Sequence, residues 1–187
     1  MIIDYINNFN RILNSLIVTE NKKVTKTQKA IDSILERFLN IKTNTNTIYL
    51  IGNGGSNGVI SHASVDLVNT CRIKAVPISE SGLITCFAND YGYENVFNKP
   101  LEIYLSKSDC LIAVSSSGAS KNIINSAKTA KEKGSFIITF TGFNPQNSLR
   151  NIGDYNFWLN SSDYGMVEIG HALLIHYLSD EFSRKHL

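Results

Sequence analysis

The chain has 187 residues, of which 43% are hydrophobic and 18% are charged, and its formal net charge is +2. This composition is typical of one globular domain with a sizeable core, and it excludes a disordered chain and a strongly basic nucleic-acid-binding protein. No apolar run approaches the roughly 20 residues that span a bilayer, and the N-terminus lacks a signal-peptide pattern, so we expect no membrane partner.

Two amphipathic helices are predicted at the start of the chain. Apolar residues recur every three or four positions over residues 2–17 and again over 24–38, which is the spacing of a helix with one buried face. A polar turn near residues 19–21 would join them into a helical hairpin within residues 1–40. Such a hairpin must bury its apolar stripes against the core or a second subunit, and we expect it to serve oligomerisation.

From residue 47 onward, strand candidates alternate with helical segments. Strands are expected at 48–51, 75–78, 110–114, 135–141 and 155–159. Helices are expected at 57–69, 83–88, 94–105 with an interruption at Pro100, 121–133 and 165–183. This alternation predicts an α/β core over residues 47–187, with a mostly parallel sheet covered by helices on both faces.

Two polar loops each follow a predicted strand and precede a helix. The first is Gly-Asn-Gly-Gly-Ser at 52–56, and the second is Ser-Ser-Ser-Gly-Ala-Ser at 115–120. Both should open at the carboxyl edge of the sheet, where free backbone N–H groups of helix N-termini favour anions. The serine loop carries no Lys, and neither loop is Gly-x-Gly-x-x-Gly, which excludes two nucleotide-binding patterns. A neutral hydroxyl cradle suits a sugar monophosphate, and the alternative is a turn that only caps its helix.

Histidine and carboxylate side chains share helix faces in two places. His62 and Asp66 lie four residues apart on one helix, and Glu168 and His171 lie one turn apart on the last helix. His176 is also on the last helix, about 80° around it from Glu168. Imidazole and carboxylate groups suit zinc, and they also suit general acid–base chemistry. The alternative interpretation is that these are satisfied core histidines.

The cysteines indicate the cellular compartment rather than the chemistry. Cys71, Cys86 and Cys110 are widely spaced and form no Cys-x-x-Cys motif. Their number and spacing favour buried thiols in a reducing cytoplasm over disulfides or a thiolate zinc site.

Taken together, these motifs resemble the SIS (sugar isomerase) domain of bacterial phosphoheptose isomerases. The resemblance rests on Gly52–Ser56 with His62 six residues later, on Ala88–Gly92, on Ser115–Ser120, and on the final helix with its two histidines. It covers nearly the whole chain, including the N-terminal helices. Each motif is weak alone, and the combination is specific.

The resemblance implies a three-layer fold with a five-stranded parallel sheet and a homotetramer whose active sites lie between subunits. It implies conversion of sedoheptulose 7-phosphate to D-glycero-heptose 7-phosphate through an enediol, usually with zinc, for lipopolysaccharide or capsule precursors. The expected partners are therefore a sugar phosphate and further copies of the chain, without direct contact to nucleic acid.

The resemblance also assigns individual residues. Phosphate and substrate would be held by Asn53, Gly54, Gly55, Ser56, Asp90, Ser115, Ser116, Ser117, Ser120 and Glu168. A metal would be held by His62, Asp66, Glu168 and His176. Asp66 would act as the proton-abstracting base, and His176 would be either a metal ligand or the general acid.

Four positions depart from the family pattern, and at one of them an Arg expected near Thr70 is absent, although Arg72 is close. The family usually has Glu where Asp66 stands, Gln where Glu168 stands, and often Asp where Gly165 stands. Asp in place of Glu keeps the carboxylate but retracts it by one methylene. Two alternatives therefore stay open: an enzyme of this fold that acts on a different sugar phosphate, and a non-catalytic regulator of the DnaA-associating type.

Overall fold

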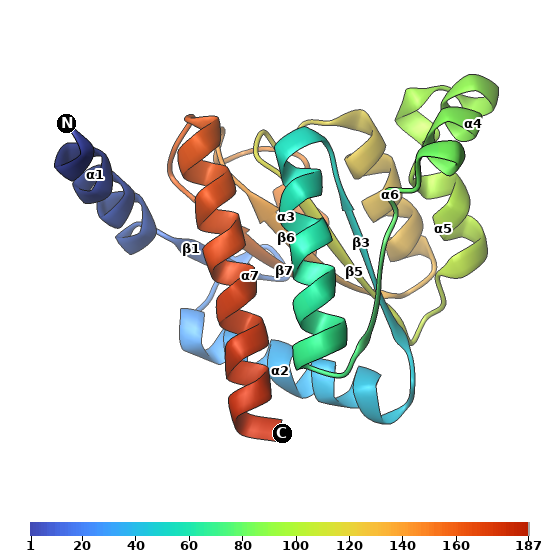
Figure 1. Cartoon of the computed structure of the whole chain (residues 1–187), viewed down its shortest axis with the longest axis horizontal. Coiled ribbons are helices and arrows are strands. Elements are labelled where there is room, and N and C mark those ends of the chain that lie inside the picture. The colour runs from blue at the N-terminus through green and yellow to red at the C-terminus, as the bar shows by residue number, and fades with distance from the viewer. Residues whose placement is uncertain (187) are drawn as a thin grey trace.

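A central sheet lies between two layers of helices in the computed structural model, which describes residues 1–186 (Figure 1). The strands are β1 (Ile17–Glu20), β2 (Lys23–Val24), β3 (Thr47–Gly52), β4 (Lys74–Pro77), β5 (Cys110–Ser115), β6 (Phe136–Thr141) and β7 (Tyr155–Trp158). The helices are α1 (Ile2–Asn14), α2 (Thr27–Thr43), α3 (Gly54–Val65), α4 (Ser81–Tyr91), α5 (Asn98–Tyr104), α6 (Lys121–Glu132) and α7 (Tyr164–His186). Short helical turns lie at η1 (Asp66–Thr70), η2 (Tyr93–Asn95) and η3 (Leu149–Asn151).

The sheet has seven strands in the order β2-β1-β7-β6-β5-β3-β4. The five strands from β3 to β7 are all parallel, which confirms the predicted α/β fold. The predicted total of five was wrong, because β1 and β2 add two antiparallel strands at the β7 edge.

The additional strands lie where the sequence had predicted a direct turn between two helices. The segment 17–19 is Ile-Val-Thr, three β-branched residues that favour a strand. Asn21 and Lys22 both have positive φ, 46° and 70°, and form the two-residue turn of a hairpin in which Glu20 pairs with Lys23. The second helix consequently begins at Thr27 rather than near 24. The hairpin was missed because the usual Asn-Gly signal is Asn-Lys in this chain.

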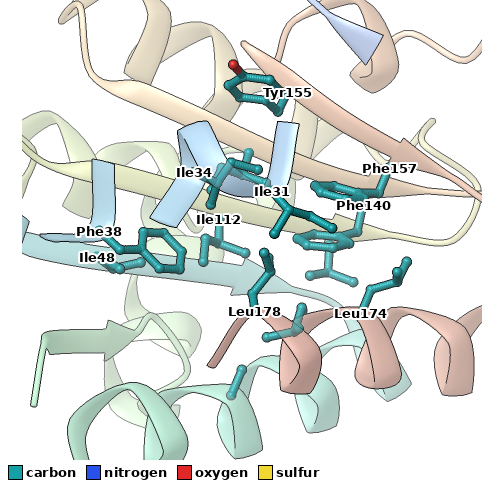
Figure 2. Close-up of a cluster of buried hydrophobic side chains, with 14 of the residues drawn as sticks. Ile31, Ile34, Phe38, Ile48, Ile112, Phe140, Tyr155, Phe157, Leu174 and Leu178 are labelled. Carbon is teal, nitrogen blue, oxygen red and sulfur yellow. The ribbon is translucent and has the colours of Figure 1, made fainter. Parts of the chain in front are cut away.

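Two hydrophobic clusters fill the spaces on either side of the sheet. One cluster joins α2, α3 and α7 to one face, where Phe38, Ile48, Ile112, Phe140 and Leu178 pack together (Figure 2). The other joins α5 and α6 to the opposite face. Every residue of β5 is buried, as expected for a parallel strand covered on both sides. These layers hold the loops at the strand ends in fixed positions.

The predicted interruption at Pro100 does not occur inside a helix. Pro100 is the third residue of α5, in the first turn, where a missing N–H breaks no intrahelical bond. The predicted helix over 94–105 therefore divides into η2 and α5. The predicted brief helix at 83–88 extends over all of α4.

The burial of the three cysteines agrees in part with the expectation from the sequence. Cys71 and Cys110 are buried, whereas Cys86 is exposed on α4, contrary to the expectation of three buried thiols. Burial raises the pKa of Cys71 to about 11, so this thiol stays protonated at neutral pH.

Across residues 1–186, the structure contains no helix with the length and apolarity that crossing a bilayer requires.

The strand order places a topological switch point between β3 and β5. From β3 the chain moves outward to β4, and from β5 it moves in the other direction to β6 and β7. In open α/β sheets, ligands bind in the crevice at the carboxyl ends of the strands at this point. The loops after β3 and β5 are the two polar loops identified in the sequence, so the fold brings them together.

Candidate active site

A cavity of about 140 Å³ lies between the two polar loops. Its lining consists of Asn53, Ser56, Val114, Ser115, Ser116, Ser117, Ser120, Tyr164 and Glu168. Both predicted phosphate loops therefore contribute to one hollow, together with the first turns of α7. Glu168 is the one charged residue of that lining, and no lysine or arginine belongs to it.

Two helices begin at this cavity without a side-chain cap. Asn53 is the N-cap of α3 and Ser120 is the N-cap of α6, and neither side chain accepts a hydrogen bond from its own helix. Gly54 opens α3 with a φ of +52°, a conformation that suits glycine. Apart from the Ile123 N–H, which donates to Asn122 Oδ1 at 2.9 Å, the first N–H groups of both helices remain available to a ligand, and both macrodipoles favour an anion there.

The hydroxyl of Ser116 indicates that the cavity can bind a polar ligand. Ser116 is 4% exposed, and its Oγ has no hydrogen-bond partner. A buried hydroxyl without a partner costs about 1–3 kcal/mol, so a ligand oxygen would relieve that cost. Ser56 and Ser115 are buried beside it, at 4% and 5% exposure.

Contacts between Gly118 and Asn147 fix the conformation of the serine loop. Gly118 has a φ of +61°, and an added Cβ there would collide with the side chain of Asn147. Asn147 is itself buried and donates to the carbonyl oxygens of Gly142 and Asn144, at 3.3 and 2.9 Å. The loop is therefore preorganised before any ligand binds.

A second group of polar side chains lies further along α3 and α7, which pack side by side (Figure 1). His62, Asp66 and His176 each offer one atom, and these atoms lie within 4.8 Å of one another. His176 Nδ1 is 2.8 Å from Asp66 Oδ2, and His62 Nε2 is 3.9 Å from the same oxygen. Asp66 opens the π-helical turn η1, a local distortion that is frequent at functional sites.

The three side chains are suited to holding a divalent metal ion. The contact between Asp66 Oδ2 and His176 lacks hydrogen-bond geometry, and this buried oxygen has no donor. Two imidazoles and one carboxylate match a catalytic zinc site, which keeps a further position open. The His62 side chain is 61% exposed and that of His176 is 43% exposed, so the cluster is accessible from outside the chain.

The structure does not bring every predicted site residue together. Glu168 lies with the serine loop, and its distance from His176 along α7 is about 12 Å, because eight residues separate them at about 1.5 Å each. Asp90 is exposed at the end of α4, where it accepts a hydrogen bond from Asn89, and it does not line the cavity. His171 is fully buried, and its Nε2 lies 3.2 Å from the Thr141 carbonyl oxygen. His171 is therefore a core histidine, as in the alternative interpretation, but it is not fully satisfied, because its buried Nδ1 has no hydrogen-bond partner.

Three residues near the cavity were absent from the sequence-based prediction. Tyr164 lines the cavity from the first turn of α7, and its ring packs edge-to-face against Phe143, with the two ring centroids 4.8 Å apart. Asn122 and Tyr93 hydrogen-bond to the side chain of Asn53. The only sequence signal for Tyr164 was its aromatic side chain just before a predicted helix. No sequence pattern pointed to Asn122 or Tyr93.

Comparison with known proteins places the chain in a family. Residues 4–142 match the SIS domain family. The phosphoheptose isomerase of Fusobacterium nucleatum is 30% identical over 162 residues, which is 84% of this chain and 83% of that protein. The phosphoheptose isomerase of Cytophaga hutchinsonii is 36% identical over 133 residues, covering 68% of each chain.

A solved structure agrees with the sequence relatives. The phosphoheptose isomerase of Neisseria gonorrhoeae superimposes with a TM-score of 0.76 at 26% identity, covering 82% of this chain and 86% of that one. The residues that match the SIS domain family include both polar loops, because they extend from within α1 to Gly142. The chain therefore belongs to the SIS domain family and, within it, to the phosphoheptose isomerases, which makes it an isomerase.

Proposed function

We propose that this protein interconverts sedoheptulose 7-phosphate and D-glycero-heptose 7-phosphate by moving a proton between adjacent carbons. The observation that carries the proposal is the cavity with two uncapped helix N-termini and the unpartnered Ser116 hydroxyl. This arrangement suits a phosphate group. The relatives named phosphoheptose isomerase supply the heptose identity of the substrate.

In this proposal the serine loop and the start of α3 hold the phosphate and orient the sugar. Ser56, Ser115, Ser116, Ser117 and Ser120 supply hydroxyl donors, and Asn53 contacts a substrate oxygen. Tyr164 and Glu168 carry the remaining polar groups of the lining, and Glu168 would contact the sugar. Holding the substrate in one geometry lowers the entropic part of the activation barrier, and the precision of this geometry matters most near the reacting carbons.

Asp66 is the proposed base in the proton transfer. Its carboxylate removes the proton from the hydroxyl-bearing carbon next to the carbonyl, which gives an enediolate, and returns it to the former carbonyl carbon. A second proton passes from the hydroxyl oxygen to the former carbonyl oxygen, which completes the exchange of the two groups. His176 lies 2.8 Å from the Asp66 carboxylate and either orients it or donates a proton to the carbonyl oxygen. His176 serves one of these roles when it is not bound to a metal.

His62, Asp66 and His176 are the residues that would hold a divalent metal, with zinc as the proposed ion. When bound, such an ion polarises the substrate carbonyl as a Lewis acid. Glu168 was predicted as a fourth ligand, but within one chain it lies about 12 Å along α7 from His176.

A second copy of the chain would explain this separation. Apolar side chains are exposed on three neighbouring helical segments: Ile2, Ile3 and Ile6 on α1, Val65 and Val68 next to Asp66, and Ile169, Leu173 and Tyr177 on α7. The α7 residues recur every four positions and so form one stripe. We propose that these faces pack against other subunits of a homotetramer, so that the cavity of one subunit meets the Asp66 cluster of another. The free cysteines fit the reducing cytoplasm as its location.

The test is to follow sedoheptulose 7-phosphate by NMR with purified protein, before and after treatment with a chelator. The expected result is formation of the aldose, loss of the rate on chelation, and recovery when zinc is added. Pentose and hexose phosphates run in parallel test the first alternative. If the protein binds these phosphates without converting any of them, the isomerase proposal fails and the regulatory alternative gains support.

A further inference from the structure

The side chain of Asn53 is held by a pair of hydrogen bonds from a residue outside the cavity. Asn53 Nδ2 donates to Asn122 Oδ1 at 3.0 Å, and Asn122 Nδ2 donates to Asn53 Oδ1 at 2.9 Å. Asn122 lies in the first turn of α6, is 3% exposed, and is not part of the cavity lining. The pair joins the loop after β3 to the helix that follows the serine loop.

A backbone group fixes the orientation of both amides. The N–H of Ile123 can only donate, and it donates to Asn122 Oδ1 at 2.9 Å. This N–H is one of the first in α6, where no helical carbonyl oxygen is available to it. Because Asn122 Oδ1 points to Ile123 and to Asn53 Nδ2, Asn122 Nδ2 must face Asn53 Oδ1. The oxygen and nitrogen positions of Asn53 therefore follow from the network.

Tyr93 occupies the remaining acceptor position of Asn53. Its hydroxyl donates to Asn53 Oδ1 at 3.1 Å, so both lone pairs of that oxygen are in use. One N–H of Asn53 Nδ2 is bound to Asn122, and the second N–H is the only unused polar group of the side chain. Since Asn53 lines the cavity, it presents a hydrogen-bond donor to the ligand.

We propose that Asn122 is a positioning residue, which fixes Asn53 as a donor toward an oxygen of the bound sugar phosphate. Asn122 acts through Asn53 and does not itself touch the substrate. The ligand atom at this position is an acceptor: a phosphate, carbonyl or hydroxyl oxygen. This inference rests on the proposed function, because it names the orientation of a group in the same site.

The experiment is a double-mutant cycle between Asn53→Ala and Asn122→Asp. Asp has nearly the shape of Asn and still accepts from Ile123, but it places a second oxygen against Asn53 Oδ1. One bond of the reciprocal pair is then replaced by a repulsive contact in either orientation of the Asn53 amide, so Asn122 no longer fixes the Asn53 donor toward the cavity. The cycle is measured on kcat/KM for sedoheptulose 7-phosphate and, by calorimetry, on its Kd. Loss of one such bond corresponds to about a tenfold change.

The matched control is Asn125→Asp, which adds the same charge one turn later on α6. Asn125 donates to the Glu94 carbonyl oxygen at 3.0 Å and has no hydrogen bond to Asn53. The Asn125→Asp substitution should therefore change kcat/KM by less than about threefold. Asn122→Ala, checked by thermal unfolding, removes the positioning bonds without adding charge and should reproduce the tenfold loss in kcat/KM.

The expected result is a tenfold effect of Asn122→Asp that falls below about twofold once Asn53 is already Ala. Equal effects in both backgrounds, or an equal effect of Asn125→Asp, would overturn the positioning role. If the unaltered protein binds the sugar phosphate without turnover, the isomerase proposal fails and the Kd cycle alone decides the role of Asn122. If it does not bind the sugar phosphate at all, both proposals fall.

Discussion

Replacing Gly55 with alanine tests whether the position of Glu168 matters for the reaction. A Cβ on Gly55 would lie 2.5 Å from the Glu168 carboxyl carbon, whereas ordinary contacts begin near 3.4 Å. The carboxylate must therefore move by about 1 Å, and a misplacement of that size can reduce a rate on the order of 100-fold. Gly55 is the second residue of α3, and its φ is not positive, so the helix itself tolerates alanine. Alanine should even stabilise the helix, by up to about 1 kcal/mol.

Gly58→Ala is the control, because a Cβ at Gly58 meets nothing within 4 Å and lies on the same helix. Steady-state kinetics with sedoheptulose 7-phosphate and thermal unfolding would be measured for both variants. We expect both to unfold at or above the temperature of the unaltered protein, with only Gly55→Ala losing kcat/KM by 10- to 100-fold. Unchanged kinetics in Gly55→Ala would show that the placement of Glu168 over the start of α3 has no part in turnover.

Three further predictions concern single side chains. Asp66→Asn should lower kcat at least about 100-fold while calorimetry still detects sugar-phosphate binding, and full activity would remove Asp66 from the chemistry. Ser116→Ala should weaken phosphate affinity about tenfold yet raise unfolding stability by about 1 kcal/mol, because the buried hydroxyl has no partner; a loss of stability would contradict this. Burial lowers the pKa of His171 to about 4 from 6.5, so its contribution to stability is complete above about pH 6.5 and is lost as pH falls through about 4. The loss reaches about 3 kcal/mol, and His171→Gln should flatten this part of the pH–stability curve measured by chemical denaturation.

The parts of the fold that sequence patterns predicted are those with a strong local signal. The strand at β5 reads as a continuous apolar run, and α6 follows it with a helical period and ends near Gly134. Such periodicities report which face of an element is buried, and they need no knowledge of the rest of the chain. The short hairpin of β1 and β2 has no Asn-Gly turn signal, and β1 also pairs with β7, more than a hundred residues away, which no local pattern reports.

The candidate site also has parts that local sequence patterns indicate and parts that depend on the tertiary structure. The two polar loops and the pair of His62 and Asp66 were found from local patterns, because each lies within one strand–loop–helix unit or one helix turn. Only the tertiary structure brought the two loops to one cavity, through the strand order at the switch point. It also separated Glu168 from His176, which the family resemblance had grouped as ligands of one metal ion. A helix face is set by angle, whereas contact also depends on rise along the axis and on what packs beside each turn.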